Sequence, residues 1–164
     1  MITGISILGT VAGLAALVCG LEWYLGRYVL KDLYGKRLHF LRKNGKHVEI
    51  LRLEHLENPG AAGGLLKGRG KLLDRLTLVC LALLVVEMLY RVLVRKHKVV
   101  TGYGMLLAGG ISNYLQRRRK GTVTDYIRFP FLPGRWLPKL VFNLADFFVF
   151  LGCILALFNR KETE

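Results

Sequence analysis

Two aspartates in this 164-residue chain have positions that suggest catalysis. Asp125 follows one long apolar run, and Asp146 lies near the start of another. A carboxylate within or beside an apolar segment is costly, and it is therefore a functional candidate. Two neighbouring carboxylates can share a proton, so that one activates water while the other polarises a carbonyl group. The alternative, from spacing alone, is that Asp125 caps a turn while Asp146 binds a helix N-terminus or Arg117.

The composition indicates a membrane protein rather than a soluble domain. Hydrophobic residues make up 52% of the chain and the mean hydropathy is +0.35, yet the formal net charge is +14. Apolar spans in lipid and basic loops beside anionic headgroups explain this combination. The basic residues lie mainly between apolar runs and not along one amphipathic helix, so we expect no nucleic-acid partner. The cysteines and histidines form no metal-ligand pattern, so we expect no metal and no cofactor.

Four segments have the length and apolar density that are needed to cross a bilayer. They are residues 5–25, 72–94, 99–115 and 140–158. Lipid offers no hydrogen-bond partner to the backbone, so these segments are predicted to be helices. The expected architecture is an all-α membrane protein in which residues 1–164 form a single polytopic domain. Four crossings place both termini on one side of the membrane and the first and third loops on the other.

The first loop contains a strong hairpin signal. Residues 38–42 and 47–53 flank Asn44-Gly45, a pair that is typical of a type I′ turn. We therefore expect a small β-hairpin or sheet on the membrane surface, over about residues 36–58. The third loop, residues 117–139, combines prolines with aromatic side chains. That mixture predicts an irregular segment at the membrane interface.

Three short blocks of sequence carry a resemblance to a known family. The first is Asn58-Pro59-Gly60-Ala61-Ala62-Gly63. The second is Gly109-Gly110-Ile111-Ser112-Asn113, followed by Arg117, Gly121, Val123 and Asp125-Tyr126. The third is Val141-Phe142-Asn143-Leu144-Ala145-Asp146. In their order and spacing, these blocks resemble the lipoprotein signal peptidase (signal peptidase II) family over most of the chain.

The resemblance implies a fold, an activity and a location. The family's fold is four transmembrane helices with a small extracytoplasmic sheet. Its activity is the removal of the signal peptide of prolipoproteins next to a diacylglyceryl-modified cysteine, without a cofactor. The implied location is the cell (cytoplasmic or inner) membrane, with several crossings and the active site towards the extracytoplasmic face. The implied partners are the lipid-modified prolipoprotein and membrane lipids, which the basic loops suggest are anionic.

The resemblance also assigns roles to residues of this chain. Asp125 and Asp146 would be the catalytic pair. The implied substrate-binding residues are Asn58, Gly60, Ala61, Asn113, Arg117 and Asn143.

This sequence departs from the family's pattern at three places. Where the family has Asp-Gln-x-x-Lys at the end of the first span, this chain runs from Glu22 to Arg27. The family's Asp before Arg117 is Gln116, and its aromatic residue after Ala-Ala is Gly63. These departures favour an alternative, a relative that binds lipopeptides without cleaving them. A small transporter or channel using Asp146 and Glu87 is a third interpretation.

Basic residues are concentrated in the two loops that carry the candidate site. The first loop, residues 27–71, has eleven Lys or Arg and the third, residues 117–139, has seven. The positive-inside rule places such loops in the cytoplasm, whereas the family resemblance places them outside. We follow the resemblance, because it rests on three motif blocks. We then expect the excess basic residues to hold anionic lipid or an acidic substrate segment at the outer face.

Overall fold

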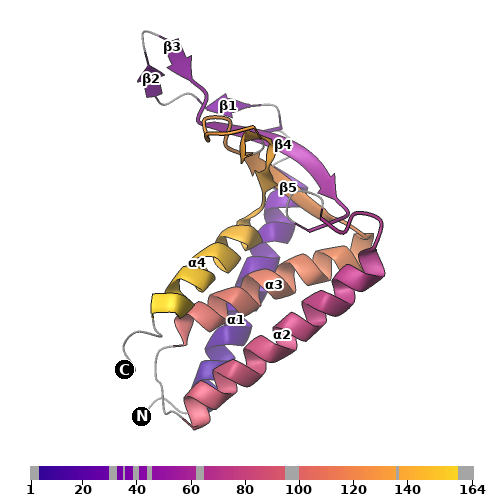
Figure 1. The fold of residues 1–164 in the computed structure, drawn as a ribbon, viewed down its shortest axis with the longest axis vertical. Helices are drawn as coiled ribbons and strands as arrows, with labels where there is room; N and C mark the ends of the chain where they lie inside the picture. The colour runs from indigo at the N-terminus through magenta and orange to yellow at the C-terminus, as the bar shows by residue number, and fades with distance from the viewer. Residues whose placement is uncertain are drawn as a thin grey trace.

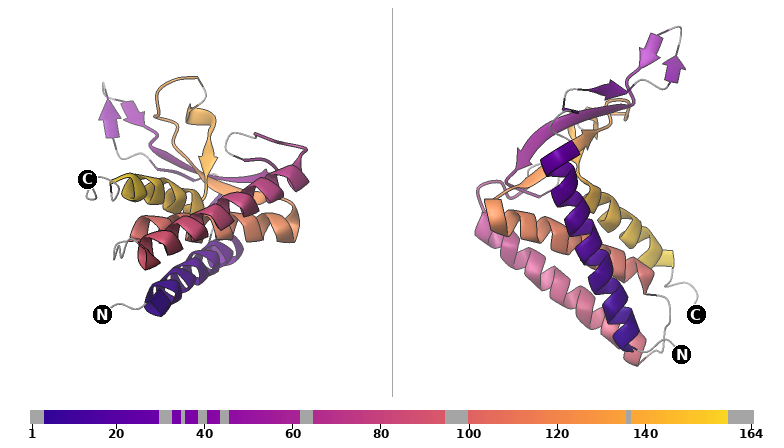
Figure 2. Two further views of the ribbon diagram at one scale, coloured as in Figure 1. Left: turned by 60° about the horizontal axis from the view of Figure 1, so that its bottom comes forward. Right: turned by 180° about the vertical axis from the view of Figure 1, so that it is seen from behind.

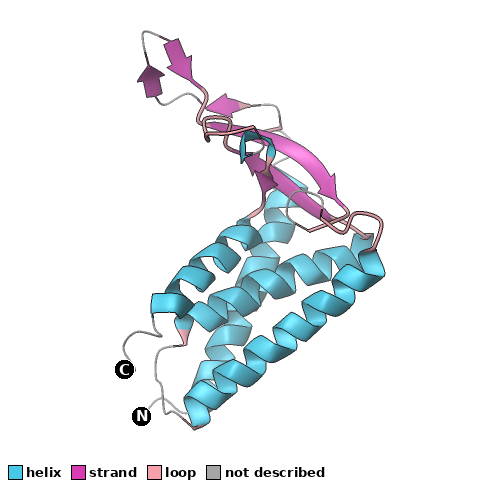
Figure 3. Cartoon of the chain, in the orientation of Figure 1, coloured by secondary structure: helices cyan, strands magenta, loops and turns pink. Residues whose placement is uncertain are grey.

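Four α-helices carry a small antiparallel sheet at one end (Figure 1 and Figure 3). The computed structural model describes residues 4–29, 33–34, 36–38, 41–43, 46–61, 65–94, 100–135 and 137–158. The helices are α1 (Gly4–Tyr24), α2 (Gly70–Leu93), α3 (Thr101–Lys120) and α4 (Leu144–Phe158). A π-helix, η1 (Leu25–Val29), continues α1, and a short 3-10 helix, η4 (Leu137–Lys139), precedes the last strand.

All four helices have one end beside the sheet. These ends are the C-termini of α1 and α3 and the N-termini of α2 and α4, while the start of α1 and the finish of α4 lie at the opposite end (Figure 1). The first and third loops therefore meet at one end of the bundle. In the centre of the bundle, α3 contacts α1, α2 and α4 (Figure 2).

Helix α2 has the strongest character of a membrane span. Among the described residues, it is the one helix that is both long enough and apolar enough to cross a bilayer. Only 6% of its most apolar window is buried within the protein, so the apolar side chains of this window are not packed in a protein core. The apolar parts of α1 (residues 9–24) and α4 are shorter.

The sheet joins two loops that are distant in sequence. Its strand order is β1 (Arg37–Leu38), β4 (Leu51–Asn58), β5 (Val123–Arg128) and β6 (Val141–Phe142). A separate hairpin pairs β2 (Leu41–Lys43) with β3 (Lys46–Val48), on either side of the predicted Asn-Gly turn, whose two residues lie outside the described part of the chain. The hairpin prediction agrees with this register, and the strands expected over about residues 36–58 are present, while β5 and β6 of the third loop extend the sheet beyond the first loop.

The third loop is more regular than the sequence suggested. Helix α3 continues to Lys120, because its last turn of basic side chains suits the negative end of a helix dipole. Gly121 then ends the helix at φ +78°, with its N–H donating to the Arg117 carbonyl at 2.8 Å. The chain enters β5 two residues later, and β6 forms just before α4. The expected irregular segment therefore contains a helix end and strand β5.

Helices α3 and α4 are packed so closely that glycine is required at their contact. A Cβ atom at Gly109 would collide with the Ala145 carbonyl oxygen and lie 2.8 Å from Val149 Cγ2. A Cβ atom at Gly152 would lie 2.7 Å from Leu106 N. Small residues allow such close approach between membrane helices. This contact holds the start of α4, and with it Asp146, against α3.

We expect Gly109→Ala to destabilise the protein by about 1–3 kcal/mol, because the methyl group would force α4 away from α3. Thermal unfolding in detergent would measure the effect. Gly20→Ala is the matched control, because a Cβ atom at Gly20 meets nothing within 4 Å. Equal melting temperatures for Gly109→Ala and the wild type would contradict this account of the contact.

Candidate active site

The two aspartates predicted to act together line the same cavity. Asp125 lies in β5 and is 3% exposed, and Asp146 lies in the first turn of α4. The cavity has a volume of about 430 Å³ and lies where the sheet meets the helix ends. All eight residues named from the sequence as catalytic or substrate-binding line it.

Asn143 connects the two carboxylates directly. Its side-chain Nδ2 donates to Asp125 Oδ1 at 2.8 Å, and its backbone N–H donates to Asp146 Oδ2 at 3.0 Å. Asn143 has no exposed surface, so its amide cannot form hydrogen bonds with bulk water in place of those with the carboxylates. One buried residue therefore fixes the position of each carboxylate relative to the other.

Asn143 and Asp146 also form a reciprocal cap on α4. The Asp146 N–H donates to Asn143 Oδ1 at 3.0 Å, while the Asp146 carboxylate accepts the Asn143 N–H. This is the geometry of a capping box, which satisfies free N–H groups at a helix start. The structural alternative for Asp146, binding a helix N-terminus, is thus realised together with its place in the cavity. Asn113 adds a further donor, from Nδ2 to Asp146 Oδ1 at 2.9 Å.

A tight turn after β4 brings Asn58 to the other aspartate. The Gly60 N–H donates to Asn58 Oδ1 at 2.9 Å, which orients the side-chain amide. Asn58 Nδ2 then donates to Asp125 Oδ2 at 2.9 Å and to the Ala61 carbonyl at 3.3 Å. Arg117, 9% exposed, donates to the Gly60 carbonyl at 3.5 Å and places a positive charge beside the cavity. The turn and the arginine together form part of the cavity wall.

The surroundings of Asp125 favour its protonated form. Burial raises the pKa of Asp125 to about 6, and the nearby Asp146 charge acts in the same direction. The hydrogen bonds from Asn58 and Asn143 lower this pKa but do not outweigh the burial. A carboxyl with a pKa near 6 exchanges its proton readily at pH values close to neutral, so it can alternate between donating and accepting a proton, as the members of an aspartic pair must.

Glu22 is a site residue that the sequence analysis treated only as a departure from a motif. It is 6% exposed, and its Oε1 accepts the Ala145 N–H at 2.8 Å. Tyr126 donates its hydroxyl to Glu22 Oε2 at 3.3 Å and accepts the Leu144 N–H at 3.0 Å. Glu22 thus links the residue after Asp125 to the residues before Asp146. The available signal was a carboxylate at the end of an otherwise uncharged apolar run.

The described part of the chain contains no group of three or more His, Cys, Asp or Glu side chains that could hold a metal ion. The carboxylates instead receive amide and backbone donors. The expectation that no metal or cofactor takes part stays a prediction.

The sequence model of the family described as Signal peptidase (SPase) II matches residues 14–160, which includes every residue of the site. The chain belongs to the signal peptidase II family. This signal peptidase II family member is 34% identical to the lipoprotein signal peptidase of Halothermothrix orenii over 117 residues, 71% of this chain and 74% of that protein. It is also 34% identical to the lipoprotein signal peptidase of Clostridioides difficile, over 70% of this chain and 76% of that one.

Two solved structures, each described as a bacterial membrane enzyme, share the fold of this signal peptidase II family member. One has a TM-score of 0.64 at 20% identity and covers 94% of this chain and 88% of its own. The other has a TM-score of 0.62 at 20% identity and covers 95% of both chains. The family prediction and its peptidase class are confirmed, and the non-cleaving alternative is not favoured by these relatives. The predicted roles of single residues stay predictions.

We expect Asp125→Asn to change how the stability depends on pH. Because the folded-state pKa of Asp125 is raised from 3.8 to about 6, its protonation stabilises the fold fully below pH 3.8, and this stabilisation is lost as the pH rises through about 6. A pKa difference of this size corresponds to about 3 kcal/mol, and asparagine cannot ionise. Relative to the wild type, the variant should therefore gain up to about 3 kcal/mol between pH 4 and pH 8.

Unfolding in detergent at several pH values would measure this difference. A stability difference between variant and wild type that is constant over this pH range would show that Asp125 is not buried as described.

Proposed function

We propose that this protein is an intramembrane aspartic endopeptidase that removes the signal peptide of prolipoproteins next to a diacylglyceryl-modified cysteine, with Asp125 and Asp146 as its catalytic pair. The observation that carries the proposal is the contact of buried Asn143 with both carboxylates, in the cavity that they share. Such a pair needs a fixed relative position and one shared proton, and the amide donors around it supply the first.

The chemistry follows from two carboxyl groups in different protonation states. The ionised member removes a proton from a water molecule, whose oxygen attacks the scissile carbonyl carbon. The protonated member donates a hydrogen bond to the carbonyl oxygen as it gains negative charge. The tetrahedral intermediate then collapses: the C–N bond breaks, the amine leaves with a proton from the pair, and the other product is a carboxylic acid. The pair returns to its singly protonated state.

The other residues of the cavity have two proposed roles, which are to hold the carboxylates and to contact the substrate. Asn58, Asn113 and Asn143 hold the carboxylates, and Gly60 and Ala61 present backbone at the cavity wall, where a substrate chain can approach closely. Arg117 gives a positive charge for a carbonyl or a lipid headgroup. These binding roles are part of the proposal.

An apolar approach from the membrane adjoins the pair. The cavity is also lined by Leu73 and Thr77 of α2 and by Val149 and Phe150 of α4, and Phe150 is 63% exposed. A signal peptide and the acyl chains of its modified cysteine are apolar, so they can reach the site along this side without leaving the lipid. The same side chains would exclude bulk water from the pair.

The proposed topology has all four helices crossing the cell membrane, with the sheet and the aspartate pair at the extracytoplasmic face. The supporting observation is that the helix ends that flank the first and third loops lie on one side of the bundle (Figure 1). On this topology the basic residues of both loops face the outer leaflet, where they attract anionic lipids.

We expect Asp125→Asn and Asp146→Asn each to lower the rate of cleavage by at least about 1000-fold, because each removes a proton-transfer group. The assay incubates purified protein with a diacylglyceryl-modified prolipoprotein and follows signal-peptide release on a gel. Glu87→Gln is the matched control: Glu87 lies on α2, pairs with Arg91 at 2.7 Å and does not line the cavity.

Loss of cleavage in both aspartate variants, with the control active, supports the pair. Cleavage that persists in either variant would remove that residue from the proposal. A wild-type protein that binds the lipidated substrate but never cleaves it would show that the proposed function is wrong.

We expect Glu22→Gln to lower kcat by about 10- to 100-fold with little change in KM, because the amide loses the charge that holds Ala145 N–H and Tyr126 in place. Glu22→Asp keeps the charge and should recover part of the rate. Steady-state kinetics with the same substrate separate the two parameters. If both variants lose stability and activity to the same extent, Glu22 is a packing residue and does not position the pair.

A further inference from the structure

A second cavity lies behind the aspartate pair, on the reverse faces of the same elements. Strand side chains alternate between two faces, and a helix also presents two sides. Asn58, Asp125 and Asn113 line the cavity of the pair. Their neighbours Glu57, Thr124 and Ser112 line the second cavity, which has a volume of about 370 Å³. The two cavities share no lining residue.

Three buried hydrogen-bonding groups in this second cavity have no partner within the described chain. The atoms concerned are Tyr34 Oη, Ser112 Oγ and Gln116 Nε2, and all three are buried. Ser112 is 1% exposed. A buried polar group without a partner is costly, so three of them around one cavity indicate a missing ligand. Each of the three can donate a hydrogen bond.

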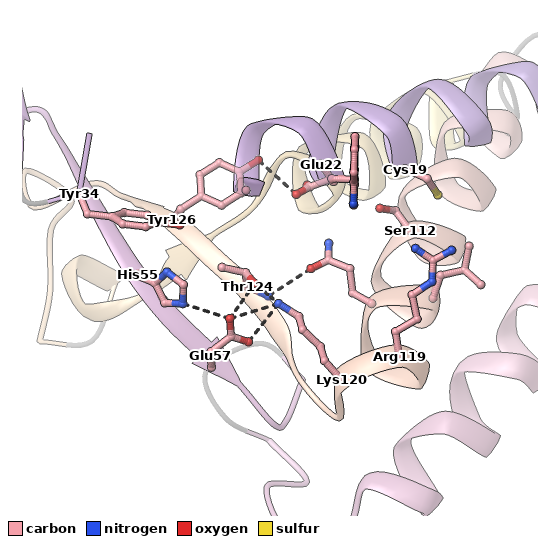
Figure 4. A pocket seen from close by; sticks show the side chains of 14 residues that line it. Cys19, Glu22, Tyr34, His55, Glu57, Ser112, Arg119, Lys120, Thr124 and Tyr126 are labelled. Atoms are coloured by element: carbon pink, nitrogen blue, oxygen red, sulfur yellow. Dashed lines mark hydrogen bonds and ion pairs between the residues drawn. The ribbon is translucent and has the colours of Figure 1, made fainter. Parts of the chain in front are cut away.

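The charges around the cavity leave one cation unpaired. Glu57 is the acceptor for Thr122, Thr124 and Lys120, and although its burial acts to raise the pKa, these bonds lower it to about 2. Glu22 is likewise occupied by Tyr126 and Ala145, as Figure 4 shows in part.

Arg119, on the other side of the cavity in Figure 4, has no ion pair within the described residues. The free groups are therefore one guanidinium and three donors, which suits an anion that accepts hydrogen bonds.

The position of the cavity selects the kind of anion. Its apolar wall is formed by Cys19 and Trp23 near the end of α1 and by Leu115 of α3. Trp23 is 56% exposed and Leu115 is 37% exposed, so this wall continues onto the outer surface of the helices. Tryptophan at a helix end is typical of the level of the lipid headgroups. A ligand here has an apolar part along the helices and an anionic part at their ends.

We propose that this second cavity binds the phosphate headgroup of an anionic phospholipid, through Arg119, Gln116 and Ser112. The headgroup lies behind β5, opposite the aspartate pair, and the acyl chains lie along α1 and α3. This site does not depend on the catalytic proposal, because none of these three side chains contacts either aspartate. The proposed site would hold the basic C-terminal end of α3 at the level of the lipid headgroups.

The test uses the fluorescence of Trp23 in the full-length protein with Trp136→Phe, which leaves one tryptophan. The protein is reconstituted in phosphatidylcholine vesicles that contain brominated phosphatidylglycerol or, at equal mole fraction, brominated phosphatidylcholine. Bromine quenches tryptophan at short range. We expect the anionic lipid to be bound about fivefold more tightly than phosphatidylcholine, the preference expected from one basic residue at a membrane surface.

Three variants separate a built site from general attraction. Arg119→Gln and Gln116→Glu should abolish the preference, and Gln116→Glu keeps the acceptor that now binds the Thr124 N–H at 3.3 Å. Arg118→Gln is the matched control: it removes the same charge from the next residue, which faces Asp74 and does not line the cavity. Circular dichroism would show that each variant is folded.

The proposal is supported if the preference for the anionic lipid is lost in Arg119→Gln and Gln116→Glu and kept in Arg118→Gln. Equal losses in Arg118→Gln and Arg119→Gln would show only attraction to a basic surface and would overturn it. Absence of any preference in the wild type would do the same. If free glycerol phosphate abolishes the selective quenching, the cavity takes a soluble phosphate compound and the lipid proposal is wrong.

Discussion

The first turn of α4 is the constraint on which the arrangement of the site depends. A helix start has N–H groups without partners inside the helix, and within a membrane they must find acceptors from the protein. Here the N–H groups of Leu144, Ala145 and Asp146 donate to Tyr126, Glu22 and Asn143, in that order. These three acceptors come from β5, from α1 and from the residue before the helix. Satisfying one helix end therefore brings three distant segments together.

The same requirement explains why two buried carboxylates are tolerated beside each other. The positive end of the α4 dipole favours negative charge near Asp146, and amide donors surround both members of the pair. The geometry needed for catalysis and the geometry needed to cap α4 are thus one geometry. Close packing of α3 on α4 at Gly109 maintains it, because the Ala145 carbonyl lies directly against that glycine.

The alternation of side chains along β4 and β5 separates two environments. The face with Asn58 and Asp125 closes over the proposed catalytic cavity, while the face with Glu57 and Thr124 closes over the second one. Tyr126 lies on the second face, yet its hydroxyl reaches the start of α4. A ligand behind the strand would therefore lie next to the hydrogen bonds that hold the aspartate pair, without competing for the substrate's place.

The features that could be predicted from the sequence are those that local chemistry determines. Apolar runs predicted helical segments, Asn44-Gly45 predicted a hairpin, and carboxylates beside apolar runs marked Asp125 and Asp146. The pairing of β4 with β5 could not be predicted, because a long-range strand contact leaves no local signal in either loop. Helix α4 begins at Leu144 and not at residue 140 as the apolar run predicted, because Val141 and Phe142 are apolar enough for a helix but pair with β5 instead.

A carboxylate at the end of an uncharged apolar run could mark Glu22 as a candidate, but its role depends on a partner 123 residues away, the Ala145 N–H, which no local pattern indicates. The structure nevertheless gives Glu22 a role that the family's Asp-Gln-x-x-Lys pattern does not describe. Glu22 lies near the end of α1 and is 6% exposed, so the Ala145 N–H at the start of α4 finds in it an acceptor that water does not replace. The hydroxyl of Tyr126 binds the second oxygen of the same carboxylate, which ties β5 to both helices. A departure from the motif can therefore coincide with a residue that supports the site, because the requirement is an acceptor at the start of α4 and not a particular local pattern.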